Sequence, residues 1–308
     1  MSNIHANKKK IKNKKIKIPK FSLHELKIIF KTRRLEDLEG LQFVEDSLKK
    51  KRGYVFKLPS KNTPVIVLFS GGLDSTTTCA LLMEEYKFRV YPIFFRTGFD
   101  RNKYEFEAAS ALAELFKKRY GSLFRPIKVV DYAPLYPPAK QKEPIWNLSY
   151  DQLSNGIRCI YAMKYAYQLE KFNNEKIRTI FTCHISTDGE GVLDQTLSSL
   201  RKIMLYLCMG TKDYSWQVSA LGLEKELGFY YGKDFEITWS SEHQIPLEIS
   251  RTSCYRNGKY HCGECIYCSV RKESFIKAGV VDKTIYANEL FLARLANRIK
   301  QKMKSYLR

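Results

Sequence analysis

The sequence predicts an α/β protein with a parallel sheet covered by helices on both faces, followed by a small C-terminal segment that binds zinc. Strand-like apolar runs alternate with helix-like stretches over residues 62–249, an order typical of a parallel sheet. Four closely spaced cysteines follow within residues 250–308. The chain has 308 residues, of which 44% are hydrophobic, so it is long enough to bury a core.

The elements of residues 62–249 are predicted in chain order. Apolar runs predict the strands, helical spacing of apolar residues predicts the helices, and Gly121 is a natural end for the second helix. The predicted strands are 65–69, 89–95, 127–130 and 179–183, and the predicted helices are 76–86, 104–120 and 156–169. A proline-rich loop is expected over 134–144, and after residue 198 we expect a helix over 218–227 and a strand over 236–239.

Residues 1–61 are predicted to be a basic N-terminal extension that is partly disordered. They hold 18 Lys and Arg against 6 Asp and Glu, which is +12 of the net charge of +21. Disorder is expected over 1–20, a short helix over 23–30 and a strand-like run at 54–56. A solvated tail and a surface for nucleic acid or another acidic partner both fit this charge. Near the other end, apolar residues at helical spacing over 292–307 predict a helix.

The apolar and cysteine content predicts a cytoplasmic protein. No apolar run follows the basic start as in a secretory signal, and the apolar run over 203–209 is too short to span a bilayer. The eight cysteines fit that compartment as thiols and metal ligands rather than as disulfides. Four of them occur singly in apolar contexts, which predicts buried core positions: Cys79, Cys159, Cys183 and Cys208.

The sequence SGGLDST at residues 70–76 is the strongest functional signal. It lies between a predicted strand and a predicted helix, where backbone N–H groups at a helix start bind phosphate. The two glycines allow a sharp turn and a close ligand approach. Ser70, Ser75 and Thr76 add hydroxyl donors, and Asp74 is a candidate ligand for Mg²⁺. No GxxxxGK[ST] loop and no GxGxxG after a strand is found, which excludes the two commonest nucleotide-binding motifs.

This turn resembles the pyrophosphate loop of the ATP pyrophosphatases, which activate a substrate as its adenylate. The resemblance implies a Rossmann-like fold of the adenine nucleotide alpha hydrolase type. It also implies ATP contacts from Ser70, Gly71, Gly72, Leu73, Asp74, Ser75 and Thr76.

A second motif, C-x7-C-x2-C-x2-C, is formed by Cys254, Cys262, Cys265 and Cys268. Zinc prefers four tetrahedral ligands, and four thiolates leave no open position, so a structural zinc site is predicted. The short loop between the first two cysteines has little apolar mass, so the metal would contribute folding energy. A redox pair and an iron–sulfur cluster are the alternatives. His261 is expected to face outward.

Together, the two motifs resemble those of the 7-cyano-7-deazaguanine synthase (QueC) family. The likeness continues in HCGEC at 261–265, RKESF at 271–275 and AGVVDKT at 278–284, which look like the family's closing segment. The GIR sequence at 156–158 is similar to the family's Gly-Arg-Asn helix start. TDGEGVLD at 187–194 is similar to its Thr-Asp-x-x-Gly-Tyr-Pro-Asp segment.

The resemblance implies an ATP-dependent C–N ligase that forms AMP and pyrophosphate. Its reaction would convert 7-carboxy-7-deazaguanine and ammonia into 7-cyano-7-deazaguanine in the queuosine pathway, with ATP, Mg²⁺ and structural zinc. Ser70, Asp74 and Ser75 would act on the phosphates, Arg158 would neutralise phosphate or carboxylate charge, and Asp188 would accept hydrogen bonds from the base. A homodimer is implied as well.

The chain departs from the family pattern in its basic N-terminal extension and in a strand-like insertion, residues 235–247, before Cys254. Three alternatives therefore stay open. A paralogue would attach an activated deazaguanine to a protein or another amine, for instance in anti-phage defence. A tRNA-modifying enzyme with the same loop would use the basic extension. A nucleic-acid-binding module would use the zinc loop without catalysis, although binding alone would not need the SGGLDS turn.

Overall fold

The computed structural model of the protein describes residues 16–98, 100–132, 153–251, 254 and 258–291. Its centre is a five-stranded parallel sheet with the strand order β3-β2-β1-β4-β5 in the described residues. The strands are β1 Pro64–Leu68, β2 Arg89–Arg96, β3 Lys128–Asp131, β4 Thr179–Thr182 and β5 Gln217–Ala220. The prediction of a parallel α/β fold is confirmed, and four of these strands lie where they were predicted.

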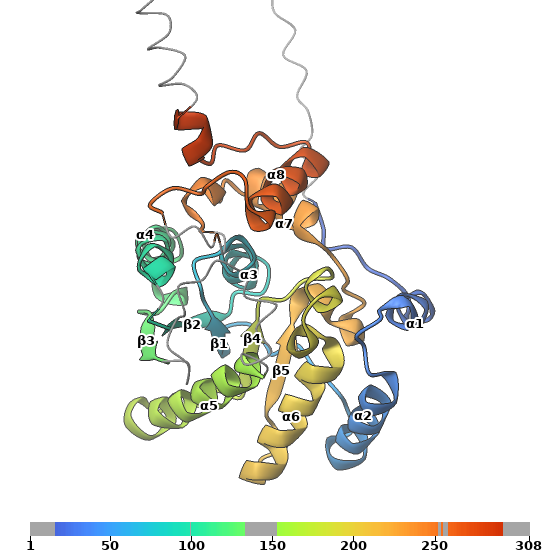
Figure 1. Ribbon diagram of the computed structural model, residues 1–308. Helices are drawn as coiled ribbons and strands as arrows, with labels where there is room; N and C mark the ends of the chain where they lie inside the picture. Colours follow the sequence, from blue (N-terminus) through green and yellow to red (C-terminus); the bar gives the residue numbers. More distant parts are fainter. Residues whose placement is uncertain (1–15, 99, 133–152, 252–253, 255–257, 292–308) are drawn as a thin grey trace, which may run out of the picture.

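Helices cover both faces of the sheet, as Figure 1 shows. One face carries α3 Leu73–Glu84, α4 Asp100–Tyr120 and α7 Lys233–Glu242. The other carries α5 Ser154–Asn173, α6 Leu197–Thr211 and α2 Leu38–Arg52. Side chains of β1 alternate between the two layers, because Val65 and Val67 join the first core and Ile66 joins the second.

The N-terminal part packs against this body through two helices. The helix predicted over 23–30 is confirmed as α1 Leu23–Thr32. The helix α2 was not predicted, although Leu41, Val44 and Leu48 share one helical face and are buried. The strand predicted at 54–56 is wrong, because Val55 and Phe56 are buried by packing without pairing to a strand. Residues 1–15 of the predicted disordered tail lie outside the described residues.

Two predictions after residue 198 are also wrong. The helix expected over 218–227 is strand β5 followed by single helical turns. The strand expected over 236–239, within a longer strand-like run, is helix α7. Ile237, Thr238 and Trp239 favour strands by propensity. Here α7 instead buries Phe235, Ile237 and Trp239 against its neighbours, and tertiary packing outweighs that preference.

The C-terminal segment places helix α8 Ile266–Ala278 against α7. Single helical turns complete the described structure, at Gly121–Leu123, Asp188–Glu190, Leu193–Gln195, Leu221–Leu223, Lys225–Leu227 and Leu247–Ile249. The predicted loop at 134–144 and helix at 292–307 lie outside the described residues. Among the helices of the described part, none combines the length and apolar character needed to cross a membrane.

Candidate functional site

The SGGLDST segment forms a tight turn at the carboxyl end of β1. Gly71 has φ of 72°, and a Cβ atom there would lie 2.7 Å from the backbone nitrogen of Ala109 in α4. Only glycine fits this position without strain. Helix α3 begins at Leu73 rather than at the predicted Thr76, so Asp74 and Ser75 lie in its first turn. Since no side chain caps this helix start in the described residues, its first N–H groups face the turn as anion donors.

Hydroxyl groups brace the turn from within. Ser70 Oγ accepts a hydrogen bond from the Gly72 N–H at 3.2 Å and lies 3.2 Å from Ser75 Oγ. Ser75 and Thr76 both donate to the Gly72 carbonyl, at 3.1 and 2.7 Å. The predicted loop residues are thus brought together, and their contacts fix the backbone on which a phosphate would rest.

Charged side chains from three parts of the chain meet beside this turn. The Lys233 Nζ at the start of α7 lies 3.0 Å from both carboxylate oxygens of Asp74. Glu236, one turn further along α7, is fully buried and faces Asp74. Asp188 follows β4, and its Oδ2 accepts the Ile185 N–H at 3.0 Å. Sequence reasoning missed Lys233 and Glu236, because a strand was predicted over 236–239 and no local pattern placed either residue near the glycine turn.

Burial and crowding of negative charge change the acidity of this group. Burial, with the nearby Asp74 charge, raises the pKa of Asp188 to about 6, although Lys233 acts in the opposite direction. The same two causes raise the pKa of Glu236 well above its ordinary value. The Asp74 carboxylate raises the pKa of Lys233 although burial opposes it. The ammonium of Lys233 therefore stays charged.

Arg158 and His184 lie at the same end of the sheet. Arg158 donates to Asn155 Oδ1 at 3.3 Å, and its guanidinium stands 5.8 Å from the centre of the Tyr132 ring. Burial lowers the pKa of His184 to about 4, and the charges of Arg158 and Asp74 also act on it. Arg158 and Asp74, which come from opposite faces of the sheet, are therefore both close enough to act on one buried histidine.

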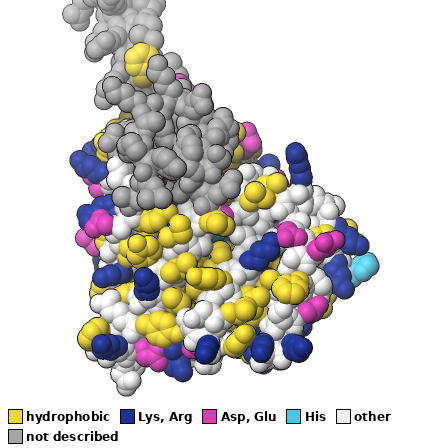
Figure 2. Space-filling model, turned by 60° about the horizontal axis from the view of Figure 1, so that its bottom comes forward, with side chains coloured by type: hydrophobic (Ala, Val, Ile, Leu, Met, Phe, Trp, Pro, Cys, Tyr) yellow, Lys and Arg dark blue, Asp and Glu magenta, His cyan; other side chains and the backbone are white. Residues whose placement is uncertain are grey.

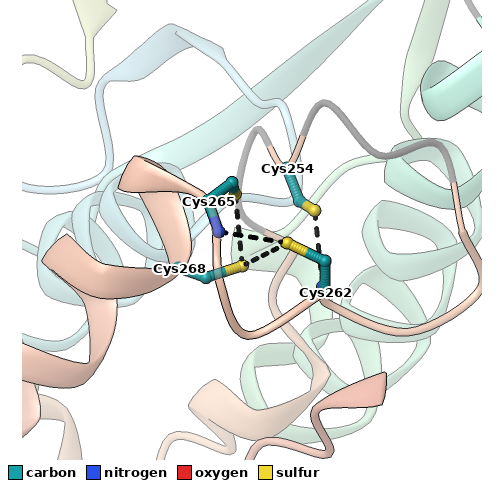
Figure 3. Close-up of side chains that lie close together, drawn as sticks. All are labelled: Cys254, Cys262, Cys265 and Cys268. Atoms are coloured by element: carbon teal, nitrogen blue, oxygen red, sulfur yellow. Dashed lines mark hydrogen bonds between the residues drawn. The ribbon is translucent and has the colours of Figure 1, made fainter. Parts of the chain in front are cut away.

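The four predicted metal ligands converge, as Figure 3 shows. The sulfur atoms of Cys254, Cys262, Cys265 and Cys268 all lie within 4.8 Å of one another and are buried. Cys268 Sγ lies 3.8 Å from Cys262 Sγ and 3.5 Å from Cys265 Sγ. Four sulfurs at about 2.3 Å from one zinc ion would stand about 3.8 Å apart. The donor set and spacing fit a tetrahedral metal site, and the metal would hold the loop by thiolate bonds.

The prediction for His261 is wrong. Its side chain is buried, its backbone bridges to Tyr286, and burial lowers the pKa of the imidazole to about 3. Among the single cysteines, Cys79, Cys159 and Cys208 are buried as predicted, whereas Cys183 is partly exposed.

Two hollows lie on the face of the sheet that α5 covers, where α5 meets β3. The larger has a volume of about 470 Å³ and is lined by residues that include Arg125, Tyr165 and Phe172. Figure 2 shows hydrophobic side chains spread over the face of α5 and α6, where Phe172, Tyr206 and Met209 are exposed. Neither hollow includes a residue of the glycine turn.

The parallel sheet, the glycine turn after β1 and the uncapped start of α3 define a nucleotide-binding protein of the ATP-pyrophosphatase (PP-loop) class. Residues 64–131 match the family model described as "Queuosine biosynthesis protein QueC". A 7-cyano-7-deazaguanine synthase of Desulfitobacterium hafniense is 31% identical over 229 residues, covering 73% of this chain and 93% of that protein. One from Acetivibrio thermocellus is 28% identical over 233 residues, covering 72% and 96%. The chain belongs to the 7-cyano-7-deazaguanine synthase (QueC) family.

Solved structures are more distant. A 4-thiouridine synthetase in complex with RNA and ATP is 14% identical, with a TM-score of 0.38, covering 70% of this chain and 50% of that chain. At this distance the likeness carries no argument about function.

Proposed function

We propose that this protein adenylates 7-carboxy-7-deazaguanine with ATP and converts it, with ammonia, into 7-cyano-7-deazaguanine. The observation that carries the proposal is the 31% identity to a synthase over 93% of that protein's length. The glycine turn and the four cysteines, which the family resemblance rests on, are both formed in the structure.

The reaction needs two activations, because a carboxylate is a poor electrophile. The substrate carboxylate attacks the α-phosphate of ATP, which releases pyrophosphate, and ammonia then displaces AMP to give an amide. The amide oxygen then attacks the α-phosphate of a second ATP, which releases a second pyrophosphate, and loss of AMP with that oxygen and of protons from nitrogen leaves the nitrile. Each step develops negative charge on phosphate oxygens, so catalysis here is positioning and charge stabilisation.

Different residues of the chain would bind the phosphates, the base and the metal ions. The N–H groups at the start of α3, with the Ser70 and Ser75 hydroxyls, would hold the pyrophosphate. Arg158 would neutralise carboxylate or phosphate charge, and Asp188, with one oxygen on the Ile185 N–H, would accept from the base. Asp74 is the candidate ligand for Mg²⁺, which would neutralise phosphate charge. The four cysteines would hold zinc for structure, away from the reaction.

The test is release of AMP and pyrophosphate together with mass-spectrometric analysis of the product. The reaction contains ATP, Mg²⁺, ammonium and 7-carboxy-7-deazaguanine, with an Asp74→Ala variant as the control. Free 7-cyano-7-deazaguanine from the wild type and none from the variant is expected. A folded, metal-loaded protein that leaves the carboxy base unchanged would refute the synthase reaction.

A second candidate keeps the activation and changes the acceptor to a protein, an RNA or another amine. The match to the synthase covers 73% of this chain, and the part outside the match favours this candidate. The basic N-terminal extension would then bind the acidic or macromolecular acceptor. ATP-dependent AMP release without the free nitrile, and with deazaguanine mass added to an acceptor, would distinguish it.

The homodimer stays a prediction, to be checked by light scattering.

A further inference from the structure

Lys233 occupies the position at the glycine turn where a cation is most needed. Its ammonium lies 3.0 Å from both oxygens of Asp74, in the fork of the carboxylate. Asp74 belongs to the first turn of α3, directly after the glycine turn, while Lys233 comes from α7, 159 residues further along the chain. The contact therefore joins the anion-binding turn to a helix on the same face of the sheet.

Around this ammonium the acids outnumber the bases. Asp74, Asp188 and Glu236 all act on Lys233, and we call these three residues the carboxyl cluster. One ammonium cannot neutralise three ionised carboxyl groups, and the raised pKa of Glu236, due to burial and the Asp74 charge, reflects this, whereas a divalent cation would let all three ionise together. An acidic cluster alone is a common feature of protein surfaces, so a further observation is needed to identify a site.

Glu236 supplies that observation. Its side chain has no exposed area, and neither of its oxygens receives a hydrogen bond from a donor group of the described residues. The group that it faces is another carboxyl, that of Asp74. A buried carboxyl group without a donor is costly, and it is satisfied when a cation arrives between it and its neighbour.

We propose that Lys233 takes the cation's place on Asp74 in the nucleotide-free protein and gives it up when ATP and a divalent cation bind. The cation then lies between Asp74 and Glu236, with Asp188 adding a third negative charge, and the Lys233 ammonium contacts the phosphates. The inference rests on the part of the proposed function that puts ATP at the glycine turn.

The geometry permits the exchange. The side chains of Lys233 and Asp74 are 22% and 26% exposed, so the pair is open on one side. Lys233 is the first residue of α7, and its four-carbon stem can turn without moving the helix. The ammonium keeps its charge in both positions. It prevents the carboxyl cluster from repelling ATP before the metal arrives, and afterwards it adds a donor to the triphosphate.

The test compares Mn²⁺ binding and nucleotide binding in wild type and Lys233→Met. Without nucleotide, the variant should bind Mn²⁺ about tenfold more tightly, measured by electron paramagnetic resonance, because the competing ammonium is gone. With saturating Mn²⁺, its dissociation constant for ATP should rise about tenfold and that for AMP should not change, measured by calorimetry. Adding Glu236→Gln to Lys233→Met should abolish the gain in Mn²⁺ affinity.

Two controls keep the result decisive. Lys202→Met removes the same charge from an exposed pair with Asp37, on α6 at the other face of the sheet, and should change neither affinity. Lys233→Arg keeps the positive charge and should keep Mn²⁺ weakly bound, which separates the charge effect from misfolding. Unchanged Mn²⁺ affinity in Lys233→Met, or unchanged preference for ATP over AMP, overturns the inference. If the wild type binds no ATP, the proposed function fails instead. Both tests use only ATP, AMP and Mn²⁺, so neither needs the deazaguanine substrate.

Discussion

The backbone N–H of Arg251 donates a hydrogen bond of 2.8 Å to the carbonyl of Gly71, the residue of the glycine turn with positive φ. The guanidinium of Arg251 donates to carbonyl groups of the cysteine loop, including Lys259 at 2.7 Å. One residue therefore connects the anion-binding turn to the metal site. A metal held by the four cysteines would therefore help to fix the glycine turn without contacting a ligand bound there.

Loss of the metal should weaken ATP binding as well as stability. Cys265→Ser removes one of four ligands, and the loop that Arg251 contacts then loses its fixed carbonyl groups. We expect the content of bound metal to fall by most of its value, the melting temperature to drop, and the dissociation constant for ATP to rise. Metal analysis, calorimetry and ATP titration check this.

The matched control for that change is Cys159→Ala, a buried cysteine of α5 outside the cluster. It should lose about 1 kcal/mol of unfolding free energy by truncation while keeping its content of bound metal. Full ATP affinity in a metal-free Cys265→Ser protein would show that the two sites are independent.

Gly71→Ala should disable the glycine turn. The new Cβ would meet the Ala109 backbone at 2.7 Å, in addition to the cost of φ at 72°. We expect a loss of about 2–4 kcal/mol in unfolding free energy, measured by urea denaturation, and loss of ATP binding. Gly98→Ala is the control, because Gly98 has φ of 77° but open space around its Cβ position. A Gly71→Ala loss no larger than the Gly98→Ala loss would refute the steric argument.

Local patterns were enough to predict four of the five strands and both motifs. The strands β1, β2 and β4 are continuous apolar runs. A glycine turn that directly follows such a run must lie at the carboxyl end of that strand. The four cysteines were predictable because metal ligands on one short loop must converge.

Contacts between distant segments could not be predicted in this way. Phe235 to Trp239 looks like a strand, and only its packing against α3 and α8 makes it a helix. Lys233 reaches Asp74 because α7 and α3 share a face of the sheet, which no local spacing reveals. His261 was expected outside because it neighbours a ligand cysteine, but its side chain is buried beside the ring of Tyr286.

Arg201→Ala should be among the most destabilising single changes in the described core. The Arg201 guanidinium is fully buried and pairs with Glu224 Oε1 at 2.6 Å and with Glu45 Oε1 at 3.5 Å. Removing it leaves buried carboxylates without their cation, at a cost of about 3–5 kcal/mol. Urea denaturation measures the loss. The double variant Arg201→Met with Glu224→Gln should recover part of it, and a double variant no more stable than Arg201→Ala would contradict the pairing.

His184 should make the protein sensitive to mild acid. Burial lowers the pKa of its imidazole from 6.5 to about 4 in the folded state. In the unfolded chain the imidazole therefore binds a proton below pH 6.5, whereas in the folded chain it binds that proton only near pH 4. Stability from this residue is complete above pH 6.5 and is lost as the pH falls through that window. Linkage predicts a loss of about 2 kcal/mol between pH 7 and pH 5.

The variant His184→Gln isolates this contribution, because glutamine has a polar side chain that does not titrate. The difference in unfolding free energy between wild type and variant should therefore move by about 2 kcal/mol in favour of the variant on going from pH 7 to pH 5. The carboxyl group of Asp188, whose pKa is raised to about 6, has the opposite dependence and loses stability as the pH rises between 3.8 and 6. That background is common to both proteins and cancels in the difference, so a difference that does not change with pH would mean that His184 is solvated rather than buried.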